Sequence, residues 1–151
     1  MTTYKIPISV LVVIHTPDLQ VLMLERAANP GFWQSVTGSL DAENEPLVQT
    51  AIREVGEETG LDANHPCHVL RDWKQSATYD IYYAWKHRFA PGVDQNLEHV
   101  FSLEIPSPIP VTLSPREHIS QMWLPYPEAA AKVFSPTNRD AILALPQRVK
   151  N

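Results

Sequence analysis

Cysteine is nearly absent from this chain, and its scarcity excludes the disulfide-dependent classes of protein. The 151 residues include one cysteine, Cys67, so no disulfide can form within the chain. A lone thiol favours a reducing compartment. We therefore expect a cytoplasmic protein in which Cys67 is an ordinary loop residue.

Long apolar runs and an excess of basic charge are missing as well. The apolar run at residues 10–14 is much shorter than the roughly 20 residues that span a bilayer. Residues 1–5 lack the basic-then-apolar order of a signal peptide. The 17 acidic residues outnumber the 12 basic ones, which gives a net charge of −5. We expect neither a membrane nor a nucleic-acid partner, and a phosphorylated ligand would bind through a metal ion.

What the chain does contain suits one globular domain over residues 1–151. Apolar residues make up 44% of the chain, enough for a buried core. Runs rich in Val, Ile and aromatic residues predict strands at residues 5–14, 21–25, 33–37, 79–85, 97–105 and 119–124. Helices are expected at residues 46–59, 128–134 and 136–145, the last capped by Ser135. This mixed order predicts the α/β class.

The helix expected at residues 46–59 carries a group of acidic residues. Its apolar face is formed by Leu47, Val48, Ala51, Ile52 and Val55. Glu54 and Glu58 lie one turn apart at the edge of that face, and Glu57 is adjacent. Like charges at this spacing repel by roughly a few tenths of a kcal/mol, and carboxylates in a last turn also face the negative end of the helix dipole. Either the group is a solvated helix end, or a hard cation such as Mg²⁺ binds among the carboxylates.

The segment from Gly38 to Leu61 resembles the signature of the Nudix hydrolase family. That signature is Gly, five residues, Glu, seven residues, Arg-Glu, an apolar residue, any residue, Glu-Glu, any residue, Gly and an apolar residue. Glu45 is followed after seven residues by Arg-Glu-Val-Gly-Glu-Glu-Thr-Gly-Leu, a complete match from Glu45 onward. The one departure is that six residues separate Gly38 from Glu45, with Asn44 where a glycine is usual. Asn tolerates positive φ better than most residues, so the longer loop can still turn.

The resemblance implies the Nudix fold, an α/β/α sandwich around a mixed β-sheet, and hydrolysis of a diphosphate linkage. It implies Mg²⁺ as the cofactor, with Mn²⁺ able to substitute. The catalytic residues that it implies are Arg53, Glu54, Glu57, Glu58 and Glu117, and the four glutamates are also the implied metal ligands. Arg53 would hold Glu57 or Glu58 in place by an ion pair. His118 has no implied role, and we expect a surface histidine.

Further segments resemble the branch of this family that hydrolyses 7,8-dihydroneopterin triphosphate in folate synthesis. The runs Phe-Trp-Gln-Ser-Val-Thr-Gly at residues 32–38 and His-Arg-Phe-Ala-Pro-Gly-Val at residues 87–93 carry much of this likeness. The substrate-binding residues that it implies are Lys5, Arg26, Thr37, Tyr79, Asp80, Ile81, Tyr82 and Ser135.

These residues suggest that different side chains contact the phosphates and the ring of the substrate. The planar fork of Arg26 suits phosphate oxygens, and Lys5 adds a point charge. Tyr79 or Tyr82 could stack on a pterin ring, although packing in the core is an alternative. Three positions apart on the expected strand, the two tyrosines should face opposite sides. Trp33 and Trp123 are expected in the core.

Three functions are compatible with the sequence. The first is hydrolysis of 7,8-dihydroneopterin triphosphate to the monophosphate and pyrophosphate, by a monomer whose partner is this small-molecule substrate. The second is a general (d)NTP pyrophosphohydrolase that also accepts oxidised nucleotides, because pterin and guanine present similar hydrogen-bonding edges. The third is a Nudix-like binding module without catalysis. The intact pairs Arg53-Glu54 and Glu57-Glu58 argue against the third.

Overall fold

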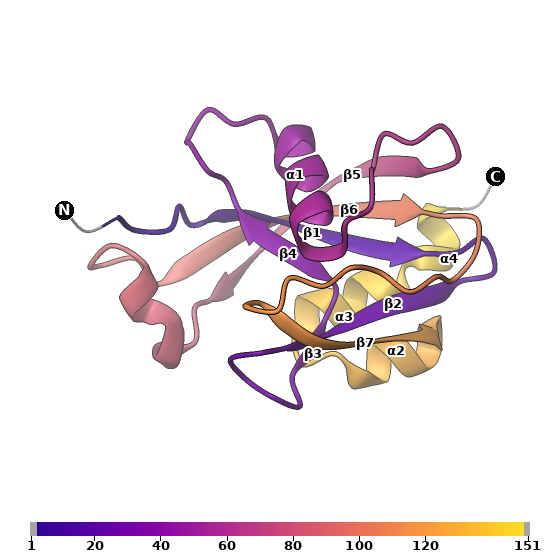
Figure 1. The fold of residues 1–151 in the computed structure, drawn as a ribbon. Coiled ribbons are helices and arrows are strands. Elements are labelled where there is room, and N and C mark those ends of the chain that lie inside the picture. Colours follow the sequence, from indigo (N-terminus) through magenta and orange to yellow (C-terminus); the bar gives the residue numbers. More distant parts are fainter. Residues whose placement is uncertain (1–2, 150–151) are drawn as a thin grey trace.

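A computed structural model describes residues 3–149 as a mixed β-sheet with helices on both faces (Figure 1). The ends of the expected domain, residues 1–2 and 150–151, lie outside the described residues. The strands are β1 (Ile8–His15), β2 (Gln20–Arg26), β3 (Trp33–Gln34), β4 (Val36–Ser39), β5 (Val69–Asp80), β6 (Gln95–Glu104) and β7 (His118–Pro125). The helices are α1 (Leu47–Thr59), the 3₁₀ helix η1 (Tyr83–Arg88), α2 (Tyr126–Lys132), α3 (Pro136–Leu143) and α4 (Leu145–Arg148).

The sheet has the order β3-β2-β1-β6-β5, with β4 paired to β1 and β7 paired to β2. Strand β1 lies near its centre, parallel to β6, and is buried on both faces. Val10 and Val12 of β1 pack with Val55 of α1, while Leu11 packs on the opposite face with Ile142 of α3. These two cores form the layers visible in Figure 1, with α1 on one side of the sheet and α2 to α4 on the other. The expected α/β/α arrangement is confirmed.

Strands β1 and β2 diverge from each other, so the sheet is split along most of the boundary between them. These two strands share one residue pair, His15 with Val21. Away from it, residues 9–12 of β1 pair with β4, and β2 pairs along its length with β7. The cavity described below lies at this division, because it is lined by residues of β1, β2 and β4.

Helix α1 begins after Pro46 and ends at Gly60, as the sequence predicts. Gly60 adopts a left-handed φ of 74°, and its N–H donates to the Gly56 carbonyl. The prediction that Val48 belongs to the buried face is wrong, since Val48 is 43% exposed. Pro46 and Gln49 are exposed too, so the first turn contacts the core through Leu47, and full burial begins at Thr50.

The strand expected at residues 79–85 is a further error. The pairing of β5 with β6 ends at Asp80 and Gln95, and Tyr83–Arg88 forms η1 instead. Most of β5 was not predicted, because its side chains lack the alternation that marks a half-buried strand. Trp73 is its one buried residue, and a bulge with Lys74 at a φ of 55° interrupts the pairing.

Several smaller expectations are confirmed. Trp33 is buried, and Trp123 is partly buried against the core on the α1 side. Cys67 is exposed in a loop. The last predicted helix is present but is divided at Ala144 into α3 and α4. None of the helices within residues 3–149 combines the length and the apolar character needed to cross a bilayer.

Candidate active site

A cavity of ≈ 1080 Å³ opens where the sheet divides, and it collects most of the residues that the sequence singled out. Its lining includes Lys5, Arg26, Thr37, Glu54, Glu58, Tyr79, Asp80, Ile81, Tyr82, Glu117 and Ser135. Arg53 and Glu57 do not line it. The structure thus brings together residues from both ends of the chain and from seven different strands and helices or their adjoining loops.

Arg53 fixes the loop that leads into α1. Its Nε and Nη2 donate to the two carboxylate oxygens of Glu45, each at 3.0 Å. Nη2 also donates to the Ser39 carbonyl at 3.0 Å, and Nη1 donates to Glu54 Oε1 at 2.7 Å. The expected partner Glu57 is half exposed and accepts a longer hydrogen bond of 3.4 Å. Arg53 therefore serves mainly to join Glu45 to Glu54, and the predicted pair with Glu57 or Glu58 is at most secondary.

Glu45 in turn holds the long loop in shape. Its Oε1 accepts hydrogen bonds from the Asp41 N–H at 2.9 Å and from Thr50 Oγ1 at 2.8 Å. The hydrogen bonds from Arg53 are the main reason why the pKa of Glu45 falls to about 2. The longer loop does turn at residues 43–44, and Asn44 takes part without a positive φ. Carboxylate hydrogen bonds, and not a left-handed residue, accommodate the extra loop residue.

Gly38 allows β4 and α1 to approach each other closely. A Cβ atom added to Gly38 would overlap the carboxylate of Glu54. Gly38 does not have a positive φ, so the requirement here is for space and not for backbone freedom. The Glu54 carboxylate is thereby seated directly against the backbone of β4.

Glu58 is a buried acid without a hydrogen-bond partner. It is 1% exposed, and within residues 3–149 neither of its carboxylate oxygens meets a donor. Burial, and then the neighbouring Glu54 and Glu117, raise the pKa of Glu58 well above its usual value. Burial also raises the pKa of Glu54. Such a pair of acids is costly unless a cation binds between them.

His118 is buried, which corrects the prediction of a surface histidine. It is 3% exposed because it begins β7, where it pairs with Arg26 of β2. Arg26 Nη1 donates to Gln34 Oε1 at 3.1 Å, and Gln34 Nε2 lies 3.1 Å from His118 Nε2. Because Gln34 Oε1 accepts from Arg26, its Nε2 is the amide nitrogen and donates to His118 Nε2. The proton of the neutral imidazole is therefore on Nδ1, which lies 3.8 Å from Glu58 Oε1. Burial lowers the pKa of His118 to about 4, so the ring is neutral at pH 7.

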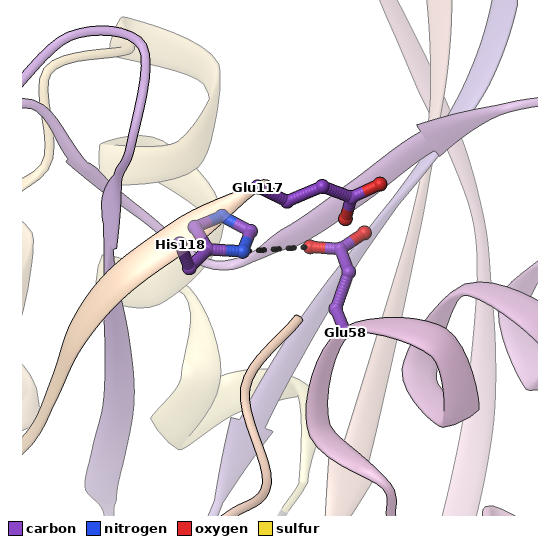
Figure 2. Close-up of side chains that lie close together, drawn as sticks. All are labelled: Glu58, Glu117 and His118. Carbon is purple, nitrogen blue, oxygen red and sulfur yellow. Dashed lines mark ion pairs between the residues drawn. The ribbon is translucent and has the colours of Figure 1, made fainter. Parts of the chain in front are cut away.

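The donor set around Glu58 fits a divalent hard cation. Figure 2 shows the carboxylates of Glu58 and Glu117 next to each other, with the His118 ring facing Glu58. Ligand atoms of these three residues lie within 4.8 Å of one another. Carboxylate oxygens are the ligands that such ions prefer, and the buried oxygens of Glu58 have no other partner in the described chain. The residues present are therefore suited to hold a metal ion here.

Cationic and aromatic side chains form another part of the lining. The guanidinium carbon of Arg26 lies 4.5 Å from the ring centroid of Trp85. Trp85 stacks on Tyr82 with centroids 4.9 Å apart and meets Phe134 edge-on at 6.0 Å. Burial, followed by the nearby charge of Arg88, lowers the pKa of Arg26. This wall offers positive charge for phosphate groups beside flat surfaces for a ring.

Tyr79 and Tyr82 both line the cavity, although they were expected to face opposite sides of one strand. Strand β5 ends at Asp80, so the alternation of side chains no longer applies at Tyr82. Tyr79 Oη accepts a hydrogen bond of 3.2 Å from Asn96 Nδ2, and burial raises the pKa of Tyr79 to about 12. Tyr79 is therefore held within a hydrogen-bonded group, whereas Tyr82 is freer to contact a ligand.

Sequence reasoning missed four residues of this site: Gln34, Trp85, Asn96 and Glu98. Asn96 and Glu98 occupy alternate positions of β6 and are both buried, but nothing in the sequence distinguishes them from exposed polar residues of a strand. Gln34 belonged to a run that was recognised as a whole, without a role for its side chain. Trp85 was assigned to a strand that does not exist there.

Comparison with known proteins identifies the class. Residues 5–145 match the NUDIX domain family, so the chain belongs to this family and is a Nudix hydrolase. The dihydroneopterin triphosphate diphosphatase of Escherichia coli (strain K12) is 43% identical over 140 residues, which cover 92% of this chain and 91% of that protein. The enzyme of the same name from Haemophilus influenzae is 38% identical over 143 residues, covering 94% and 89%. The solved structure of the E. coli dihydroneopterin triphosphate pyrophosphohydrolase matches with a TM-score of 0.86 at 42% identity and covers 93% of this chain and 95% of that one.

The close approach at Gly38 predicts that Gly38→Ala damages the protein. The added methyl group would displace the Glu54 carboxylate, the far end of a flexible side chain, from its position against β4. We therefore expect hydrolysis slowed by at least about tenfold, with little change in the free energy of unfolding measured with urea. Gly56→Ala is the control, because its Cβ would lie 3.9 Å from the Leu61 carbonyl oxygen, an ordinary contact distance. That variant should be about 0.5–1 kcal/mol more stable. A Gly38→Ala protein as active as the parent would contradict the geometry.

The burial of Glu58 predicts that Glu58→Gln stabilises the metal-free protein at pH 8. The folded-state pKa of Glu58 is raised, so the parent is destabilised above that pKa and recovers as falling pH protonates the acid. The neutral amide has no such cost. Urea unfolding in EDTA at pH 8 and at pH 5 should show the advantage of the variant at pH 8 and a smaller advantage at pH 5. A difference that grows on acidification would contradict this account.

Proposed function

We propose that this protein hydrolyses 7,8-dihydroneopterin triphosphate to dihydroneopterin monophosphate and pyrophosphate, with Mg²⁺ as its cofactor. The observation that carries the proposal is the buried, unpartnered Glu58 beside Glu54 and Glu117, in one cavity with a cationic and aromatic wall. The relatives that bear the name dihydroneopterin triphosphate diphosphatase, 38% and 43% identical over most of this chain, support the substrate.

Glu54, Glu58 and Glu117 would hold the metal ion. When bound, Mg²⁺ neutralises phosphate charge and acidifies a water molecule. Arg53 keeps Glu54 in place through its 2.7 Å hydrogen bond. Glu57, also predicted as a ligand, is half exposed and outside the lining, and we leave it out of this set.

Arg26 and Lys5 would bind the triphosphate. Both are partly buried cations in the cavity, and an anionic ligand offsets the desolvation that lowers their pKa values. Arg26 is oriented by Gln34 and by the Trp85 ring, so its fork is held ready for phosphate oxygens. Next to it, the exposed face of Tyr82 suits a stacked pterin ring.

A general nucleotide pyrophosphohydrolase is the alternative, because these cations would grip any triphosphate. The reducing cytoplasm as its compartment, a monomeric state and Mn²⁺ as a substitute ion stay predictions from the sequence.

Product analysis tests the proposed reaction. The protein is incubated with Mg²⁺ and 7,8-dihydroneopterin triphosphate or dGTP, and products are separated by chromatography and ³¹P NMR. We expect the monophosphate and pyrophosphate, with kcat/KM for the pterin at least about tenfold above that for dGTP. Glu54→Gln and Glu58→Gln should each lower kcat by about 10²-fold or more. Glu128→Gln, on the exposed surface of α2, should not.

Two results would contradict the proposal. Release of orthophosphate from the pterin substrate would show that a different bond breaks. A higher kcat/KM for dGTP than for the pterin would favour the general nucleotide enzyme.

A further inference from the structure

A second buried acid in the cavity lies on β6, and the proposed hydrolysis gives it no role. Glu98 is 5% exposed and belongs to the cavity lining. It pairs in register with Ser9 of β1 and Ala77 of β5, so it is inside the sheet and not at an edge. Val100, two positions further along β6, points to the same face and packs in the core. A carboxylate at such a position calls for a specific partner.

The protein itself supplies one hydrogen-bond donor to this carboxylate. Thr137 Oγ1 donates to Glu98 Oε1 at 2.7 Å. In the described part of the chain, no other donor and no cation pairs with this carboxylate. Burial raises the pKa of Glu98, which reflects the same shortage of stabilising contacts. Oxygen Oε2 and the remaining lone pairs of Oε1 are left for a ligand in the cavity.

The neighbouring polar side chains are already paired with one another. Asn96 Nδ2 donates to Ser9 Oγ at 2.7 Å and lies 3.2 Å from Tyr79 Oη. Ser135 Oγ lies 3.0 Å from Thr137 Oγ1 and caps α3. This group orders the cavity wall around Glu98, whose Oε2 accepts no hydrogen bond in the described part of the chain.

We propose that Glu98 recognises the 2-amino-4-oxopyrimidine edge of the substrate ring, its two oxygens accepting from the ring N–H and the exocyclic amino group. Two parallel donors match a carboxylate, and such charge-assisted pairs are strong away from water. Pterin and guanine share this edge, whereas adenine and thymine do not. The identity of the pterin rests on the proposed function, but the assignment of the edge does not.

In this arrangement Glu98 selects the ring, while Arg26 and Lys5 bind phosphates that every nucleoside triphosphate carries. Thr137 acts as a positioning residue that orients the carboxylate. A buried site built for two donors rejects a ligand that lacks one of them, because an acceptor is then left unpaired.

A substrate-and-variant cycle tests the assignment. The parent and Glu98→Gln are compared on 7,8-dihydroneopterin triphosphate, dGTP, dITP and dATP, as substrates or as competitive inhibitors. dITP keeps the ring N–H of dGTP but lacks the amino group. We expect the parent to prefer dGTP over dITP by about tenfold or more. In the variant, kcat/KM or inhibitory affinity should fall at least about tenfold for the pterin and dGTP and change little for dATP. The variant should no longer discriminate dGTP from dITP by more than about twofold.

Glu104→Gln is the matched control, since Glu104 lies on the same strand and outside the cavity, where it pairs with Arg71. It should keep the preference of the parent. Equal losses on all four compounds in Glu98→Gln would mean a structural role and would overturn the assignment. A parent that handles dGTP and dITP equally would also overturn it, whether or not the variant folds. If the parent is inactive on the pterin but prefers dGTP over dITP, and Glu98→Gln abolishes that preference, the proposed substrate is refuted. The assignment of Glu98 to the ring edge is then supported.

Discussion

The structure is organised around two carboxylates that the fold buries one helical turn apart. Glu54 and Glu58 repel each other, and burial opposes the charged form of both, although Arg53 donates one hydrogen bond to Glu54. A fold chosen for stability alone would not place them there. A cation bound between the carboxylates would offset this loss of folding stability. The same feature that lowers the stability of the metal-free protein therefore prepares it for metal-dependent hydrolysis.

The surroundings of these acids maintain the arrangement from three directions. Gly38 provides the space that Glu54 needs against β4. Arg53, joined to Glu45, orients Glu54 without entering the cavity. On the far side, hydrogen bonds from Arg26 through Gln34 to His118 connect a guanidinium group in the cavity to the imidazole that faces Glu58. The division of the sheet between β1 and β2 leaves the cavity in which these groups meet a substrate.

The sequence could predict what local contacts determine. The bounds of α1 follow from Pro46 and Gly60, and the acidic group follows from spacing along a single helix. The predictions that were wrong concern residues whose structure depends on partners distant in the sequence. His118 is buried because β7 pairs with β2, and nothing in its own neighbourhood along the chain indicates this. Strand β5 is held by pairing with β6 and has one buried side chain, so its pattern resembles a loop. The end of that strand then decided where Tyr82 points.

The most direct test of the central coupling is the stabilisation of the folded protein by Mg²⁺. Thermal unfolding of the parent and of a Glu54→Gln/Glu58→Gln double variant is followed in EDTA and in millimolar Mg²⁺, at equal ionic strength. Ligand binding to the folded state raises its stability by mass action, so the melting temperature of the parent should rise by several degrees and that of the double variant should not. An unchanged melting temperature of the parent, or equal rises in both proteins, would contradict the account.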